Sequence, residues 1–377
     1  VTVGIIGCNW GGTSASAWMD RETLSRDREL RSYIDDYEAA IAGKTEKEQI
    51  QEYREYEEYD AEWNRRAAVC YAEDPSMSWD EVQRRCGVNR WPGPMCCINP
   101  FRPAGLYECM LKRVMPYTLR GFLYYQGESD DHKPRMYDRL FSELIMKWRG
   151  DWGDFSLPFL MVQLPMHRYE ADPDYRHWCL IREAQMKVFE TVKNTGIAVI
   201  LDCGEFNEIH PKDKVPVGER LALQAMWLVY GTRTGREAFG PIYRSAVIRG
   251  DRIELHFDHA DGGFEIRGDG SGFEVAGEDG VYYPAAAVTD GLQQSSVQAS
   301  DAQDMERENT QPGGVLWVSA PQVPAPRCAR YCWTNYGPVN YFGKNGLPLA
   351  PFRTSREDAG NSEAEAHATE IHQVMEL

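Results

Sequence analysis

Two short polar segments hold the residues best suited to chemistry. Residues 123–130 read Leu-Tyr-Tyr-Gln-Gly-Glu-Ser-Asp, and residues 207–212 read Asn-Glu-Ile-His-Pro-Lys. Each segment begins where an apolar run of strand type gives way to polar residues, which is where α/β enzymes place catalytic groups. His210 could take a proton from a serine hydroxyl and return it to the leaving alkoxide. The two segments therefore predict ester hydrolysis.

A general-base histidine needs a carboxylate to orient its ring. Three acids are candidates for this role: Glu208 lies two residues before His210, Glu128 lies in the other segment, and Asp213 follows the histidine. A solvated or helix-capping acid is the simpler interpretation of each, and for Asp213 it is the better one. The choice between Glu208 and Glu128 stays open at this point.

Gln126 and Gly12 are the candidate donors to the oxyanion of a tetrahedral intermediate. A glutamine amide at a rigid strand end can donate an N–H to that oxygen, and a residue without Cβ lets the substrate approach a backbone N–H closely. Gly12 follows the apolar run 1–6, which we expect to be a strand followed by a turn and a helix. We expect the strands before Gly12, Gln126 and His210 to end at one edge of one sheet.

No serine in the chain makes a convincing nucleophile. Ser129 lies in Gly-Glu-Ser-Asp-Asp, where aspartate replaces the second glycine of a nucleophile elbow. Ser14 and Ser16 lie where a helix is expected to start, so capping is their simpler role.

The sequence predicts no metal and no cofactor. His256 and His259 fall on opposite faces of a strand or in a hairpin, and Cys328 and Cys332 lack a second close pair of ligands. The ten cysteines show no repeating spacing, which favours reduced, mostly buried thiols and a cytoplasmic location. Secretion is the alternative, because the chain opens without a methionine.

Charge and length exclude several classes of partner. The chain has 377 residues and a formal net charge of −17, which disfavours binding to nucleic acid or to an acidic membrane surface. Its apolar runs are too short to span a bilayer. Nothing in the sequence indicates an oligomeric state.

Alternating apolar and amphipathic stretches predict an α/β fold with a mainly parallel sheet flanked by helices. Besides the strand at 1–6, strands are expected at 121–125, 158–164 and 196–202, and helices at 137–149, 178–193 and 217–230.

The composition changes along the chain predict its organisation. Residues 1–240 are expected to form the α/β domain, with a charged and aromatic helical insertion at 20–95. Short alternating strands with glycine turns make 241–353 a β-rich region. Residues 354–377 hold six acids and one arginine, which is typical of a solvated acidic tail.

The motifs together resemble the sialate O-acetylesterase family, carbohydrate esterases with the SGNH (GDSL-like) hydrolase fold. The resemblance extends to about Phe352, and the matching segments are 3–13, 17–18, 121–130, 209–214, 217–221, 330–335 and 345–353. It implies an SGNH-hydrolase-like fold, an O-acetylated sugar such as sialic acid as substrate, and deacetylation through a serine acyl-enzyme.

The resemblance also implies roles for individual residues. Gly12 and Gln126 would belong to the oxyanion hole, and His210 would be the general base. Family members commonly carry an acid two or three residues before the histidine, so Glu208 would inherit the orienting role, with Glu128 as the alternative. Around an anionic sugar, arginines should gather at the pocket; the candidates are Arg102, Arg135 and Arg182.

The family's nucleophilic serine lies in a Gly-Gln-Ser-Asn-Met type block, upstream of the strand expected at 1–6. That block does not occur in this sequence. We therefore expect an N-terminally truncated chain that is weakly active or inactive alone. The alternatives are a non-catalytic carbohydrate-binding homologue and a hydrolase that uses Ser129.

Overall fold

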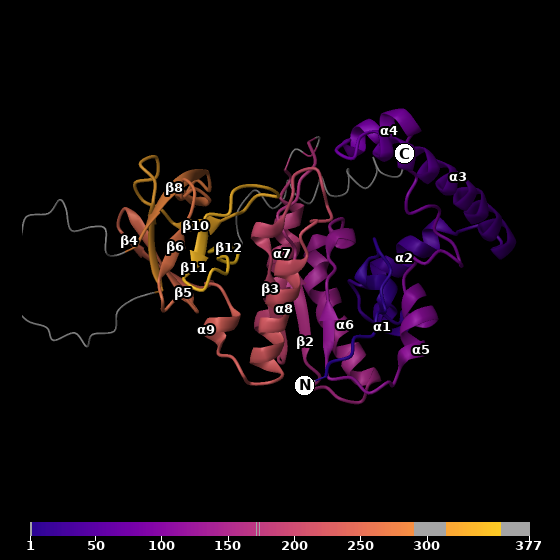
Figure 1. Ribbon diagram of the computed structural model, residues 1–377, viewed down its shortest axis with the longest axis horizontal. Helices are drawn as coiled ribbons and strands as arrows, with labels where there is room; N and C mark the ends of the chain where they lie inside the picture. Colours follow the sequence, from indigo (N-terminus) through magenta and orange to yellow (C-terminus); the bar gives the residue numbers. More distant parts are fainter. Residues whose placement is uncertain (1, 171, 173, 290–313, 356–377) are drawn as a thin grey trace, which may run out of the picture. The chain divides into compact units, whose positions relative to one another are not determined.

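The computed structural model describes residues 2–170, 172, 174–289 and 314–355 (Figure 1). The chain divides into two compact units. Among the described residues, the first unit contains 2–159 and 184–194, and the second contains 160–183 and 195–355.

The first unit begins with a series of helices. They are a 3₁₀ turn η1 (Ala15–Trp18) and the α-helices α1 (Arg21–Arg26), α2 (Arg31–Ala40), α3 (Glu46–Glu73) and α4 (Trp79–Cys86). Thr45 and Glu48 form the capping box that their spacing predicts, and the Ser78 side chain caps α4. Trp63 and Cys70 of α3 pack with Val82 and Cys86 of α4 in a small apolar core. Helices α3 and α4 therefore form a pair with a core of its own (Figure 1).

The predicted strand at 1–6 is wrong for residues 2–6. These residues have no regular secondary structure, and the side chains of Val3 and Ile5 are 65% and 82% exposed. A strand needs a neighbour that pairs with its backbone groups. Within the described parts of the chain, no strand pairs with this segment. Its apolar sequence alone therefore does not make it a strand.

An aromatic core connects the rest of the first unit. Its elements are a π-helical turn η2 (Tyr107–Leu111), α5 (Lys112–Val114), β1 (Phe122–Tyr124), the 3₁₀ turns η3 (Glu128–Asp130) and η4 (Pro134–Met136), and α6 (Tyr137–Asp151). The ring centroids of Tyr124 and Phe141 lie 4.9 Å apart, and those of Phe122 and Trp148 lie 5.4 Å apart. These contacts hold β1 against α6 and fix the strand that precedes Gln126.

The α/β part continues with β2 (Phe159–Gln163), α7 (His177–Thr191), β3 (Thr195–Val199), η5 (Leu201–Cys203), α8 (Val215–Leu228) and α9 (Gly235–Ala238). Strands β1, β2 and β3 form one sheet with β2 in the middle. Helices α6 and α7 connect consecutive strands, which is the connection that parallel strands require. The predicted parallel α/β sheet is thus confirmed.

Arg220 fixes α8 against the end of β3. Its guanidinium donates to the Val199 carbonyl at 2.8 Å and to both carboxylate oxygens of Asp202 at 2.5 and 2.8 Å. A bidentate arginine and carboxylate pair has a defined geometry. The loop 204–214, which carries His210, therefore begins and ends on two elements held together by Arg220.

The predicted β-rich C-terminal region is also confirmed. Its strands are β4 (Ile242–Arg249), β5 (Arg252–Asp258), β6 (Phe264–Ile266), β7 (Phe273–Ala276), β8 (Tyr282–Val288), β9 (Val315–Ser319), β10 (Cys328–Tyr331), β11 (Tyr341–Gly343) and β12 (Phe352–Arg353). Seven of them form a sheet in the order β12-β10-β7-β8-β9-β5-β4, and β11 pairs with β6. Most of the predicted acidic tail, from residue 356 onward, lies outside the described residues.

The ion pair between Arg330 and Glu274 links two neighbouring strands of this sheet, β10 and β7. The Arg330 side chain is buried, its Nε donates to Glu274 at 2.7 Å, and its guanidinium lies over the Tyr282 ring. Glu274→Ala should lower the free energy of unfolding by about 3 kcal/mol, because it removes a carboxylate that is hydrogen-bonded to a buried cation. Urea unfolding followed by circular dichroism measures this loss.

Glu265→Ala is the matched control. Glu265 also pairs with an arginine on a strand of this region, but both partners are exposed, so its loss should change stability little. Equal losses in the two variants would contradict the importance of the buried pair.

Candidate active site

The Gln126 side chain is oriented by four contacts. Its Oε1 accepts from the hydroxyls of Tyr124 at 3.2 Å and Tyr137 at 3.0 Å. Its Nε2 donates to the Thr13 carbonyl at 3.1 Å and to Asp130 Oδ2 at 2.5 Å. The amide plane is therefore fixed at the end of β1, as a preorganised polar group requires. Both amide hydrogens are engaged in this arrangement.

Asp130 is the acceptor at the centre of this network. The side chain is fully buried, and it accepts from Ser14 Oγ at 2.6 Å, from the Ala15 backbone N–H at 2.8 Å and from Gln126. Burial raises the pKa of the Asp130 carboxyl, although these hydrogen bonds favour its ionised form. The residues after Gly12 are thereby tied to the Gln126 segment.

Sequence analysis missed Asp130. The only available signal was its place at the end of the motif that contains Gln126. Its main partners, Ser14 and Ala15, are more than 100 residues away in the chain. Ser14 itself caps η1, as expected.

Gly12 adopts a backbone conformation that favours glycine and lies under an aromatic ring. Its φ is +72°, and a Cβ at this position would lie 2.7 Å from Cζ2 of Trp91. Trp91 in turn packs edge-on against Phe101, with ring centroids 5.3 Å apart. Any larger residue at position 12 would be strained and would collide with Trp91.

Glu128 and Ser129 lie on η3, directly after Gly127. Both side chains are partly exposed. The turn starts at Gly127 with φ 147° and ends in buried Asp130. The two residues are thus placed next to the Gln126 network on the first unit.

His210 and Glu208 meet on the loop 204–214 of the second unit. Glu208 Oε1 accepts from the His210 backbone N–H at 2.8 Å and lies 3.5 Å from His210 Nδ1. The His210 side chain is 82% exposed and that of Glu208 is 38% exposed. This loop therefore presents an accessible imidazole with a carboxylate beside one ring nitrogen. Asp213 instead accepts from the Val215 backbone N–H at 3.0 Å, at the first residue of α8.

The other candidate residues have structural partners. His256 lies beside Glu254, with 3.2 Å between Nε2 and Oε1, and the His259 ring stacks on Phe239. Arg182 is buried and donates to the Thr334 carbonyl. It is therefore not available to an anionic sugar at the surface. Within the described residues, no cluster of three or more histidine, cysteine or acidic side chains could hold a metal ion.

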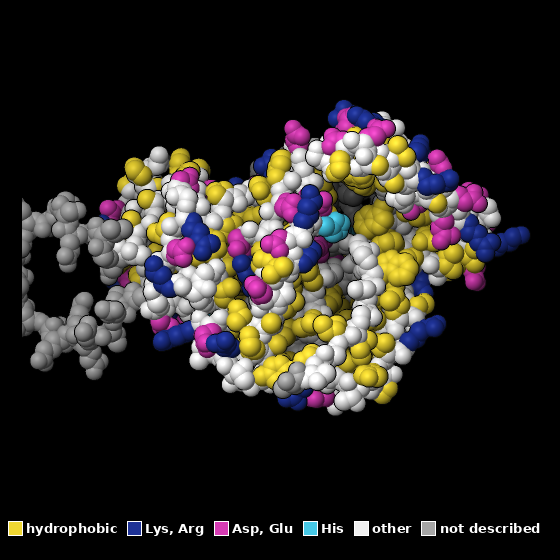
Figure 2. All heavy atoms as spheres, in the orientation of Figure 1, with side chains coloured by type: hydrophobic (Ala, Val, Ile, Leu, Met, Phe, Trp, Pro, Cys, Tyr) yellow, Lys and Arg dark blue, Asp and Glu magenta, His cyan; other side chains and the backbone are white. Residues whose placement is uncertain are grey.

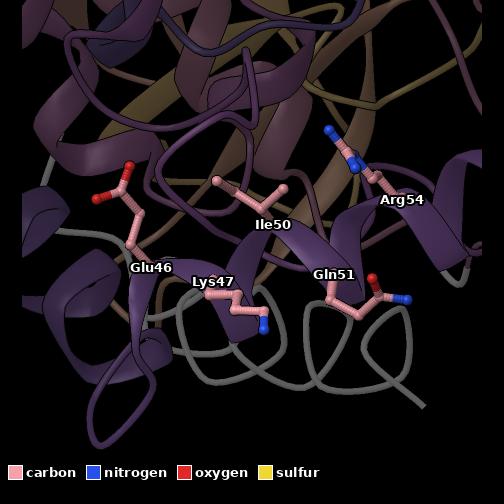
Figure 3. A pocket seen from close by; sticks show the side chains of 5 residues that line it. All are labelled: Glu46, Lys47, Ile50, Gln51 and Arg54. Atoms are coloured by element: carbon pink, nitrogen blue, oxygen red, sulfur yellow. The ribbon is translucent and has the colours of Figure 1, made fainter.

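An open hollow on the first unit does not coincide with these residues. It has a volume of about 470 Å³ and lies along the first turns of α3 (Figure 3), where it is lined by Glu46, Lys47, Ile50, Gln51 and Arg54. Among the described residues, this lining contains no histidine and no hydroxyl or thiol group. The hollow therefore shows no pairing of a histidine base with a serine or cysteine nucleophile.

The surface mixes charges of both signs. On the face in Figure 2, acidic and basic side chains lie among exposed apolar side chains. Among the described helices, none is long and apolar enough to cross a membrane.

Comparisons with known proteins agree with the motifs. Residues 96–226, which include Gln126, Glu208 and His210, match the family described as carbohydrate esterase, sialic acid-specific acetylesterase. The chain is 29% identical to the sialate O-acetylesterase of Mus musculus over 248 residues, which cover 61% of this chain and 40% of that protein. It is 32% identical to the Homo sapiens sialate O-acetylesterase over 182 residues, or 42% of this chain and 34% of that protein.

The alignments thus span two fifths or less of the length of these relatives. Among solved structures, a carbohydrate acetylesterase from Xanthomonas citri is similar, with 32% identity, a TM-score of 0.58, and coverage of 68% of this chain and 55% of that chain. By these comparisons the chain is similar to sialate O-acetylesterases and to a carbohydrate acetylesterase, and its residues 96–226 match the family described as sialic acid-specific acetylesterase.

Proposed function

We propose that this protein removes O-acetyl groups from sialic acid or a related acetylated sugar, on an SGNH-hydrolase-like fold. The observation that carries the proposal is the pair of Glu208 and His210, with 3.5 Å between Oε1 and Nδ1 on an exposed loop. A histidine oriented by a carboxylate is the base that ester hydrolysis by a serine requires. The family match over both polar motifs supports the same assignment.

In the proposed mechanism, Glu208 keeps the proton of His210 on Nδ1, so that Nε2 can accept the serine hydroxyl proton. The serine oxygen attacks the acetyl carbon, and the carbonyl oxygen becomes an oxyanion. Collapse of this intermediate breaks the bond to the sugar oxygen, which leaves with the proton from His210. Water, deprotonated by His210, then attacks the acetyl-serine. The bond between the acetyl carbon and the serine oxygen breaks, this oxygen takes the proton from His210, and acetate leaves. Glu128 is the alternative to Glu208.

Gly12 and Gln126 are the proposed oxyanion donors. Gly12 has no side chain of its own that could cover its backbone N–H, and the Gln126 amide is held by Asp130 and the Thr13 carbonyl. Because both Gln126 hydrogens are engaged, a substrate oxygen must replace one of these two acceptors. Asp130 acts through Gln126 and is therefore a positioning residue.

We propose that the nucleophile is the serine of a Gly-Gln-Ser-Asn-Met type block, which the printed sequence does not contain. Ser129 is the alternative within the chain. Its motif lacks the second glycine that allows the tight turn of a nucleophile elbow. Ser14 donates its hydroxyl to a carboxylate rather than to a histidine.

The first prediction concerns the base. His210→Ala should reduce turnover by about 100- to 10,000-fold, because a general base contributes that much. Acetate release from O-acetylated sialic acid and from a generic acetyl ester measures it, both for this chain and for a form extended upstream to the start codon of its gene. His256→Ala is the control, since His256 pairs with Glu254 in the β-rich region.

Activity confined to the extended form and lost in His210→Ala would support the proposal. Full turnover in His210→Ala would refute it. If both forms bind the acetylated sugar without releasing acetate, the protein is a carbohydrate-binding homologue.

The second prediction separates the two candidate nucleophiles. Ser129→Ala should leave acetate release unchanged in the form that is extended upstream, because the attacking oxygen comes from a different serine. Loss of turnover in this variant, with unchanged sugar binding, would instead assign the nucleophile to Ser129.

The third prediction concerns Gln126. Gln126→Ala should lower kcat by about 100- to 1,000-fold, the usual effect of removing one oxyanion donor, with a smaller change in KM. Gln51→Ala on the exposed face of α3 is the matched control. A variant that raises KM alone would show that Gln126 binds substrate in the ground state.

A further inference from the structure

The loop that carries His210 has few restraints of its own. Within residues 204–214, Glu208 accepts from the His210 backbone, Glu205 accepts from the Lys212 backbone N–H at 2.7 Å, and Glu205 and Glu208 form an isolated bridge. All these acids are on the loop itself. An exposed imidazole can hold a catalytic geometry only if other segments fix the backbone beneath it.

The segment 166–170 fixes one side of this loop. The Asn207 N–H donates to the Arg168 carbonyl at 2.9 Å, the Asn207 side chain accepts from the Glu170 N–H at 2.7 Å, and Arg168 pairs with Phe206 in a parallel bridge. At Gly204 the two backbones touch, since a Cβ there would lie 1.8 Å from the Met166 carbonyl oxygen. The loop is therefore built against this segment.

His167 fills the space beneath the loop. It is buried between the rings of Tyr169 and Trp178, with centroid distances of 4.6 and 5.3 Å. The backbone of Glu205 and Glu208 lies beside its ring, but neither ring nitrogen has a hydrogen-bond partner of ordinary geometry within the described residues. Burial lowers the pKa of the imidazole, which favours the neutral form.

A turn from the β-rich region reaches the same place. After β10, the Asn335 carbonyl accepts from the His167 backbone N–H at 2.8 Å. The Asn335 side chain is fully buried and donates to Asp172 at 3.0 Å, while its N–H donates to Asp174 at 2.9 Å. These bonds lock the turn onto the segment that supports the His210 loop.

The same turn also contacts the loop directly. The ring of Tyr336 lies 5.4 Å from that of Phe206, which is four residues before His210. Phe206 is 46% exposed. Because the core does not bury this side chain fully, the contact with Tyr336 accounts for an apolar ring at that position. An aromatic pair of this kind restricts the motion of the backbone that carries it.

We propose that the turn 334–336 of the β-rich region positions His210 for catalysis, through Asn335 on His167 and through Tyr336 on Phe206. Neither residue touches the reacting atoms in this account. The inference rests on the proposed role of His210 as the base, and it gives the β-rich region a part in the reaction beyond stability.

The test uses Tyr336, which is only partly buried and can be changed without opening the core. Tyr336→Ala, made in whichever of the two forms releases acetate, should lower kcat about tenfold or more and leave KM nearly unchanged. Small misplacements of a catalytic group have large effects on rate. Tyr336→Phe keeps the ring and should restore kcat. Phe206→Ala should cause a similar loss, and the double variant should be no worse than either single one.

Tyr243→Ala is the matched control. Tyr243 is also partly buried, and its ring stacks on Phe352 within the β-rich region. It should lose stability but keep kcat. Equal effects of the Tyr336 and Tyr243 changes on kcat would show that the turn contributes only to folding.

Amide hydrogen exchange gives a readout that does not require turnover. Tyr336→Ala should speed exchange of the Asn207 N–H, which donates to Arg168, relative to the amides of β5. If turnover survives His210→Ala, the proposed function fails. If His210→Ala abolishes turnover but Tyr336→Ala changes neither kcat nor exchange at Asn207, only the positioning proposal fails.

Discussion

The buried carboxylate of Asp130 organises the first unit around the end of β1. A fully buried acid is costly unless enough donors surround it. Ser14, Ala15 and Gln126 supply them, and the first two are more than 100 residues from Asp130 in the chain. The same bonds that satisfy the charge thus orient the Gln126 amide and fix the chain just after Gly12. Removal of the acid would leave the buried Ala15 N–H and the partly buried Ser14 and Gln126 donors without this acceptor. This part of the structure therefore depends on one side chain.

In the second unit, the ion pair of Arg220 and Asp202 rather than a single buried acid holds two elements together. Arg220 joins α8 to the end of β3, and the loop between them is shaped by backbone pairing with the segment 166–170. The polar contact of the candidate base is made by a residue close in sequence, since Glu208 lies two positions before His210. The segment that supports the loop is itself held by a residue distant in sequence, since the Asn335 carbonyl accepts from the His167 backbone N–H.

This contrast explains what the sequence could predict. Strands β1 to β3 and the capping box at Thr45 follow from residues that are near one another in the chain. The sequence left the acid that orients His210 open between Glu208 and Glu128. Asp130, Trp91 and Asn335 were missed as parts of the sites because their partners are distant in sequence. The strand expected at 1–6 failed for the same reason, since strand formation depends on a neighbouring strand rather than on apolar content.

The helical pair α3 and α4 has a further consequence. Its apolar core is formed by Trp63, Ala67, Cys70, Val82 and Cys86, all from the two helices themselves. The apolar contacts that hold α3 and α4 together are therefore made between these two helices and need no residue from another element. A change on the outer surface of α3 or α4 thus leaves the contacts that define the pair in place.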